Sequence, residues 1–116
     1  MRRASKVDAN HAAIREYLRG LGWIVFDSST LGHGFPDLVI SNRGRTVLIE
    51  VKDGSLPPSQ RKLTPDESAF FSSWQGEVYV VESIEDCYAT LEGRDEQRER
   101  KERDATCGAV RPLRGD

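Results

Sequence analysis

Residues 34–52, GFPDLVISNRGRTVLIEVK, decide the fold of this chain. Residues 35–41 and 46–52 are both rich in Val, Ile and Leu, and a polar, glycine-bearing segment, 42–45, separates them. Two short apolar runs around a tight turn are typical of a β-hairpin. We therefore predict two antiparallel strands joined by a turn at Asn42-Arg43-Gly44-Arg45.

The register of this hairpin determines which polar side chains share a face. If Arg43 and Gly44 are the two turn residues, Asp37 lies opposite Glu50. Lys52 shares the face of Glu50 because side chains alternate along a strand, and a longer or bulged turn would shift this pairing. Two carboxylates and an ammonium among apolar strands are costly unless they are compensated. A divalent cation would compensate them, whereas a buried structural ion pair would leave the second carboxylate unexplained.

The spacing of these residues resembles a known signature. Pro36-Asp37, twelve intervening residues and Glu50-Val51-Lys52 are similar to the PD-(D/E)xK motif of nucleases. The resemblance is closest to the small VRR-NUC-type nucleases of phages and prophages, and more distant to archaeal Holliday-junction resolvases. It covers roughly residues 8–88. It implies an α/β, restriction-endonuclease-like αβββαβ core, with a mixed four-stranded sheet flanked by helices.

The same resemblance implies an activity and a set of site residues. The activity is Mg²⁺- or Mn²⁺-dependent hydrolysis of phosphodiester bonds in DNA, in the manner of an endonuclease selective for branched substrates. Asp37 and Glu50 would hold the metal, and the backbone carbonyl of Val51 would be the third protein ligand. Lys52 would orient or deprotonate the attacking water, or stabilise charge on the phosphate. The alternatives are an exonuclease and a catalytically inactive DNA-processing or DNA-binding module on the same fold.

The first predicted helix offers candidates for an accessory group. Resolvases carry a glutamate eleven residues before the glycine that precedes the first strand, and counting back from Gly22 gives His11 in this sequence. The departure leaves open whether His11, Asn10 or Glu16 has that role. A surface position on the helix is the plainer interpretation of His11, and Glu16 lies away from the apolar stripe.

Two further accessory candidates lie outside the first helix. Ser29, beside Ser28 in the polar loop before the hairpin, would hydrogen-bond a phosphate or simply serve the turn. Glu67-x-x-x-Phe71 stands where exonuclease relatives carry Gln-x-x-x-Tyr, and because both positions differ, the exonuclease interpretation is weakened. Glu67 either caps its helix, with Thr64 as N-cap, or takes part in the site.

The rest of the chain predicts helices and strands around the hairpin. The expected elements are a helix from Asp8 to about Leu21, a strand over 23–26, a helix from Thr64 to about Trp74, a strand over 77–82 and a helix over 83–91. The strand over 77–82 should lie parallel to the second hairpin strand through a right-handed crossover. Phe70, Phe71 and Trp74 should face the core.

Charge divides the chain into three parts. Residues 1–6 form a basic arm, 7–92 the nuclease domain and 93–116 a charged appendage, helical or disordered. Residues 7–92 hold seven Lys/Arg against thirteen Asp/Glu, which argues against general coating of nucleic acid. Local basic pairs remain as expected phosphate contacts: Arg15 with Arg19, Arg43 with Arg45, and Arg61 with Lys62.

Composition also limits the domain count and the cellular location that we expect. The 116 residues fit one domain, with no apolar run long enough for a membrane span and no signal-peptide pattern. Cys87 and Cys107 lack metal-ligand spacing, so we expect a soluble protein of the cytoplasm, the host's if the gene is phage-encoded. We also expect a homodimer, because a branched junction needs two cuts at related positions.

Overall fold

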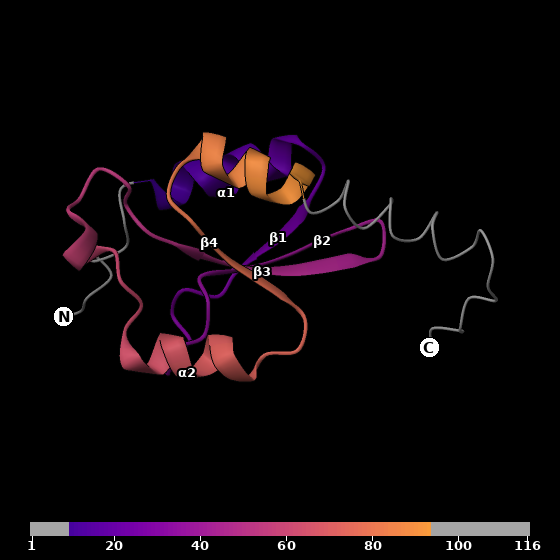
Figure 1. Ribbon diagram of the computed structural model, residues 1–116. Coiled ribbons are helices and arrows are strands. Elements are labelled where there is room, and N and C mark those ends of the chain that lie inside the picture. The colour runs from indigo at the N-terminus through magenta and orange to yellow at the C-terminus, as the bar shows by residue number, and fades with distance from the viewer. Residues whose placement is uncertain (1–9, 94–116) are drawn as a thin grey trace, which may run out of the picture.

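The computed structural model describes residues 10–93 of the chain as a small α/β domain with a mixed four-stranded sheet and three helices (Figure 1). The elements in chain order are α1 (His11–Gly20), β1 (Ile24–Asp27), β2 (Leu38–Asn42), β3 (Arg45–Val51), the short 3-10 helix η2 (Pro58–Gln60), α2 (Pro65–Ser73), β4 (Glu77–Val81) and a last helix over residues 84–93. The predicted order of helices and strands is confirmed. The basic arm and nearly all of the charged appendage lie outside the described residues.

The hairpin of β2 and β3 has the predicted turn and register. Leu38 pairs with Ile49 and Asn42 with Arg45, without a bulge. Arg43 and Gly44 have φ angles of 54° and 81°, as the two central residues of a type I′ turn require.

The sheet has the order β1-β2-β3-β4, so β1 and β4 form its two edges. β1 runs antiparallel to β2, and β4 runs parallel to β3. The parallel pairing confirms that β4 lies parallel beside β3, and the connection between them runs through α2, since parallel neighbours need a long connection. Alternate residues of each strand therefore face two different helix layers.

The main core lies on the face of the sheet that α1 and the last helix cover (Figure 1). Its buried members come from both helices and three strands: Ile14, Leu18, Leu38, Ile40, Val47, Ile49, Val51, Val81, Cys87 and Leu91. The exposed face of α1 is polar, while its apolar stripe meets the sheet, as the spacing of these residues predicts.

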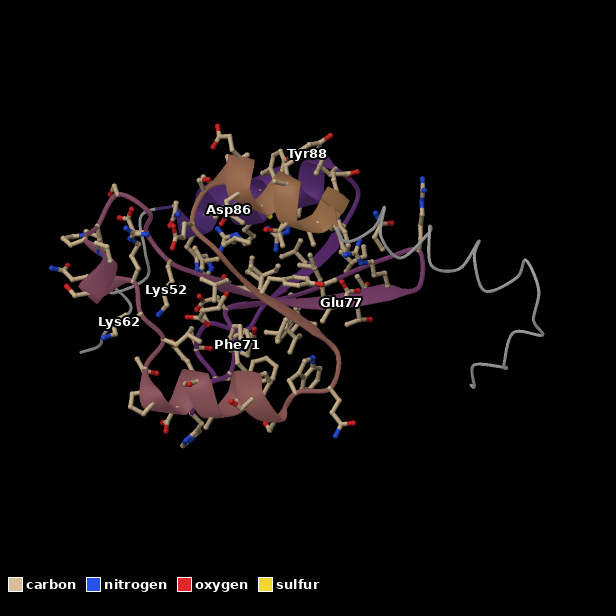
Figure 2. The ribbon with its side chains drawn as sticks, viewed as in Figure 1. Lys52, Lys62, Phe71, Glu77, Asp86 and Tyr88 are labelled. Atoms are coloured by element: carbon tan, nitrogen blue, oxygen red, sulfur yellow. The ribbon has the colours of Figure 1, made fainter. Side chains whose placement is uncertain are left out.

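The second face of the sheet carries α2, which buries fewer of its aromatic side chains than predicted. Phe71 points from α2 toward the sheet (Figure 2) and is half-buried, as is Phe70. Trp74 is 41% exposed, so its assignment to the core was wrong. Phe70 instead stacks on Trp74 with ring centroids 5.3 Å apart and meets Phe35 edge-on at 5.2 Å. The short α2 thus covers only part of this face and forms a separate aromatic cluster.

The predicted cap of α2 is confirmed. The side chain of Thr64 accepts a hydrogen bond from the Glu67 N–H at 3.2 Å, and Glu67 Oε1 accepts one from the Thr64 N–H at 2.9 Å. This capping box satisfies two N–H groups at the start of α2. Ser83 Oγ accepts from the Asp86 N–H at 2.9 Å at the start of the last helix.

Arg45 is a correction to the predicted DNA contacts. Its side chain is only 8% exposed and forms two hydrogen bonds with the Glu77 carboxylate, at 2.9 and 2.8 Å. It also donates to the Leu91 carbonyl and lies over the Trp23 ring. Alternation along β3 places Arg45 on the core face with Val47, so the guanidinium closes the end of the core and is not available to a phosphate.

Gly34 holds the loop before β2 against α2. Its φ is +82°, and a Cβ there would overlap the Asp66 carbonyl group and lie 2.9 Å from Glu67 N. We expect Gly34→Ala to lower the free energy of unfolding by about 2–4 kcal/mol, because strain and overlap add. The control is Gly32→Ala, where φ is +76° but a Cβ meets nothing within 4 Å. Urea denaturation of both variants measures the difference, and equal losses would contradict the proposed overlap.

Among residues 10–93, no helix is long and apolar enough to cross a membrane.

Candidate active site

Three predicted site residues meet where β2 begins and β3 ends. Asp37 directly precedes β2, and its Oδ2 accepts a hydrogen bond from the Val51 N–H at 2.8 Å. Lys52 directly follows β3, and its N–H donates to the Val81 carbonyl at 2.9 Å. Its side chain points into the space between the sheet and α2 (Figure 2). The Lys52 ammonium lies 3.5 Å from Glu50 Oε2, so the hairpin register brings these groups together.

The carboxyl groups of this cluster resist ionisation. Glu50 is 4% exposed, and burial, followed by the charge of Asp37 and a hydrogen bond with Glu67, raises the pKa of Glu50 to about 9. Burial also raises the pKa of Asp37, against the Val51 N–H bond and the His11 and Lys52 charges, which lower it. The site therefore holds a neutral carboxyl at neutral pH, because two adjacent buried carboxylates repel each other.

Glu67 brings α2 into the site. Its Oε1 accepts hydrogen bonds from the Thr64 N–H and from the Lys52 ammonium, both at 2.9 Å. Burial raises the pKa of Glu67, but the bonds from Thr64 and Lys52 outweigh it and the net shift is downward. Burial lowers the pKa of Lys52, but the contacts with Glu67 and Glu50 raise it by more. The net shift is upward, so Lys52 stays an ammonium. Glu67 therefore combines the two alternatives considered for it, since the same carboxylate caps α2 and holds the Lys52 ammonium beside Glu50.

His11 is buried, so the surface interpretation of this residue was wrong. It is 3% exposed, and its Nε2 lies 3.1 Å from Asp27 Oδ2. Arg15 Nη1 donates to the same oxygen at 2.8 Å, and the Ser29 hydroxyl donates to Asp27 Oδ1 at 2.6 Å. Burial raises the pKa of Asp27, but these three partners lower it well below its usual range. Sequence reasoning missed Asp27, which ends β1 and carries no signal beyond its place before the polar loop.

Asn10 ties the start of α1 to the end of the sheet. Its side-chain amide donates to the carbonyls of Lys52 at 3.0 Å and Glu82 at 2.9 Å. The backbone that carries Lys52 is thus fixed from both α1 and β4. Asn10 takes part through backbone positioning, which no local sequence pattern indicates.

The remaining accessory candidates serve the fold. Ser29 completes a turn on Asp27, with its N–H donating to Asp27 Oδ1 at 3.0 Å. Ser28 is buried and donates to the Pro36 carbonyl at 2.7 Å. Glu16 faces solvent, with its side chain 63% exposed beside Arg19 at 3.0 Å, as its place off the apolar stripe predicts. Glu16 is therefore not brought to the carboxylates of the site.

The expected phosphate contacts differ in how they are held. Arg15 pairs with Asp27, and Arg61 Nη1 lies 3.1 Å from Glu82 Oε1. Arg19, 45% exposed, pairs with Glu16 on the surface, where such a pair is weak. Arg43 at the hairpin tip and Lys62 before α2 are exposed. The exposed cations of the described residues thus come from separate parts of the chain: α1, the hairpin tip and the segment before α2.

Two carboxyl groups and one backbone carbonyl make up the implied donor set for a divalent cation. Within the part of the chain that the structure describes, no three His, Cys, Asp or Glu side chains gather as a metal-ligand set. The implied set needs only two carboxylates and the Val51 carbonyl. Its fit is supported by Glu50 Oε1, a buried oxygen without a hydrogen-bond partner in the described part of the chain. Hard oxygen donors of this kind suit Mg²⁺ or Mn²⁺, and a cation would offset the charges that raise the pKa of Glu50.

The double role of Glu67 gives a prediction with a matched control. We expect Glu67→Ala to lower stability by about 1 kcal/mol through the lost cap. It should also lower the rate of the DNA cleavage that the sequence resemblance implies about 10–100-fold, because Lys52 loses its fixed partner. Thr64→Ala removes the other side-chain hydrogen bond of the capping box and leaves the contact between Glu67 and Lys52 in place. It should match the loss of stability at an unchanged cleavage rate, measured by thermal denaturation and single-turnover cleavage. Equal rates for both variants would contradict a positioning role of Glu67.

Comparisons of the chain with protein-family models, curated proteins and solved structures find no match.

Proposed function

We propose that this chain is a metal-dependent DNA endonuclease that hydrolyses phosphodiester bonds, with selectivity for branched DNA. The observation that carries the proposal is the buried cluster of Asp37, Glu50 and Lys52, in which Glu50 has a pKa raised to about 9. Buried like charges destabilise a fold unless something compensates them, and carboxyl groups with strongly shifted pKa values cluster at functional sites. Bound Mg²⁺ or Mn²⁺ would supply a water of lowered pKa and neutralise phosphoryl oxygens.

The residues of the chain have separate tasks in this proposal. Asp37, Glu50 and the Val51 carbonyl provide oxygens for the cation, and the Val51 N–H orients Asp37 at 2.8 Å. Lys52 donates to a non-bridging oxygen of the phosphate and stabilises the charge that develops there. Glu67 and Glu50 keep Lys52 protonated, so it acts as a hydrogen-bond donor rather than as a base. Asn10 and Glu67 hold the backbone and the side chain of Lys52 in place.

The charge distribution supports a substrate with a small footprint. Residues 7–92 carry six more acidic than basic residues, and the exposed cations Arg43 and Lys62 come from different elements. Few phosphate contacts give weak binding to plain duplex, with a shallow dependence on salt. A junction or flap offers unpaired or bent strands at one point, and a small site can select them by shape.

A panel of labelled DNA substrates tests the proposal. Four-way junction, flap, single-stranded and linear duplex DNA are each incubated with the protein in Mg²⁺, in Mn²⁺ and in chelator. We expect metal-dependent internal cuts, fastest on the branched substrates. Release of single nucleotides from ends would indicate an exonuclease. Binding without cleavage in both metals would indicate a non-catalytic DNA-binding module.

A further inference from the structure

Trp74, directly after α2, presents a large aromatic ring to solvent in a fixed orientation. It is 41% exposed, which is roughly 100 Å² for a side chain of this size. Its indole stacks on Phe70, with ring centroids 5.3 Å apart and an interplanar angle of 19°. Gly76 lies against the edge of the indole, since a Cβ there would be 2.9 Å from Trp74 Nε1. The ring is thus held from two sides, and part of it stays open to a ligand.

A row of aromatic rings connects Trp74 with the candidate active site. Phe70 meets Phe35 edge-on with centroids 5.2 Å apart, and Phe35 lies two residues before Asp37. Trp74 follows Glu67 by seven residues, which corresponds to about 10 Å along α2. Figure 1 shows α2 running from the end of the sheet where β3 finishes towards the end where β4 begins. At ~3.4 Å per stacked nucleotide, Trp74 therefore lies about three nucleotides from Glu67.

We propose that Trp74 is a stacking platform for an unpaired nucleobase, in a single-stranded DNA arm that leaves the active site along α2. Every base has a planar face, so an exposed and rigid indole binds single strands without regard to sequence. Stacking needs no cation, which suits a domain whose residues 7–92 carry six more acidic than basic residues. Arg43, exposed at the hairpin tip, lies at the same end of the sheet as the start of β4 and supplies positive charge for the phosphates there.

A platform of this kind selects substrates by their unpaired bases. In duplex DNA both faces of each base are covered by its neighbours, so the indole finds no partner. A flap or an open junction presents unpaired bases close to the bond that is cut. The inference rests on the proposed function, which places that bond at Asp37, and it names single-stranded arms as the feature of branched DNA that this chain recognises.

Binding to the full chain in Ca²⁺ tests the platform without reference to cleavage. The probes are a short oligothymidine, an abasic oligomer of the same length that keeps the phosphates, and a linear duplex. We expect the oligothymidine to bind about 10–100-fold more tightly than the abasic oligomer, and to quench the fluorescence of Trp74 as a base stacks on it. Trp74→Leu keeps apolar bulk without an aromatic face, so it should bind both single strands alike.

Two further variants separate stacking from packing. Trp74→Tyr keeps a planar ring and should retain most of the preference for oligothymidine, while the fluorescence of Trp23, its remaining tryptophan, should not be quenched. The control is Tyr88→Leu, which removes a 53% exposed aromatic ring on the far side of the sheet from α2 (Figure 2). It should bind as the wild type does. Circular dichroism checks that each variant is folded.

Equal binding of oligothymidine and abasic oligomer by the wild type would overturn the proposal. So would a folded Trp74→Leu protein that still prefers the oligothymidine, or a loss of that preference in Tyr88→Leu. Base-dependent binding without cleavage of any substrate would leave the platform in place and contradict the proposed function. Metal-dependent cleavage with base-independent binding would do the reverse.

Discussion

Replacing Lys52 with alanine is expected to lower the single-turnover rate of DNA cleavage by about 10²–10⁴-fold, because a positioned cation at the developing phosphate charge is lost. The Lys52 side chain is 13% exposed and is fixed by Glu67 at 2.9 Å, so its ammonium is preorganised. Lys52→Arg keeps the charge but not its compact geometry and should recover little activity.

Lys62→Ala is the control for the chemical step, since Lys62 is an exposed lysine just before α2, the helix that carries Glu67. It should cut at close to the wild-type rate. DNA binding in the presence of Ca²⁺, measured by gel shift, should be nearly unchanged for Lys52→Ala, whereas Lys62→Ala removes an expected phosphate contact and should weaken it modestly. A Lys52→Ala protein that folds and cuts as fast as the wild type would remove Lys52 from the mechanism.

Glu50→Gln is expected to raise the stability of the metal-free protein at neutral pH. The pKa of Glu50 is about 9 in the folded chain against the ordinary value of 4.5, so the folded state holds one more proton between these values. Stability then falls as pH rises through that window, by up to about 1.4 kcal/mol per pH unit. Between about pH 5.5 and 7.5 the melting temperature of the wild type should drop on the order of 10 °C. The groups that face Glu50 are Asp37, Glu67 and Lys52.

Glutamine keeps the shape of protonated Glu50 without its titration. In chelator, Glu50→Gln should therefore show a flatter pH dependence than the wild type and a higher melting temperature at pH 7.5. Added Mg²⁺ should stabilise the wild type more than Glu50→Gln, because binding to the folded state adds to stability. Parallel pH profiles for the two proteins would contradict the assignment of a strained carboxyl to Glu50.

The hairpin could be predicted because residues close together in the sequence determine its turn and its register. Two apolar runs and a turn that accepts positive φ at Arg43 and Gly44 fix one register, and the register places Asp37 beside Glu50. The capping box at Thr64 and Glu67 was predictable for the same reason. The specific restriction-endonuclease-like core stays a prediction, since the fold confirms only a small α/β domain with a mixed sheet.

The parts that sequence reasoning missed depend on contacts between distant elements. His11 and Asp27 meet because α1 packs across β1. Arg45 points into the core because the Glu77 carboxylate on β4 accepts its hydrogen bonds there. Trp74 has the spacing of a core residue, yet α2 is too short to bring it under the sheet. The exposure of Ile24 and Phe26 could not be predicted either. The sequence of a four-residue strand does not show which of its two faces another element covers.

The central claim is metal-dependent hydrolysis at the cluster of Asp37, Glu50 and Lys52. Single-turnover cleavage of an end-labelled four-way junction tests it most directly, with wild type in Mg²⁺, wild type in chelator and Asp37→Asn in Mg²⁺. Asn keeps an oxygen to accept the Val51 N–H bond but removes the charge that would hold the cation. We predict defined internal cuts near the branch in the first reaction and none in the other two. Equal cutting by Asp37→Asn, or an uncut junction in Mg²⁺ and Mn²⁺ with folded wild-type protein, would contradict the claim.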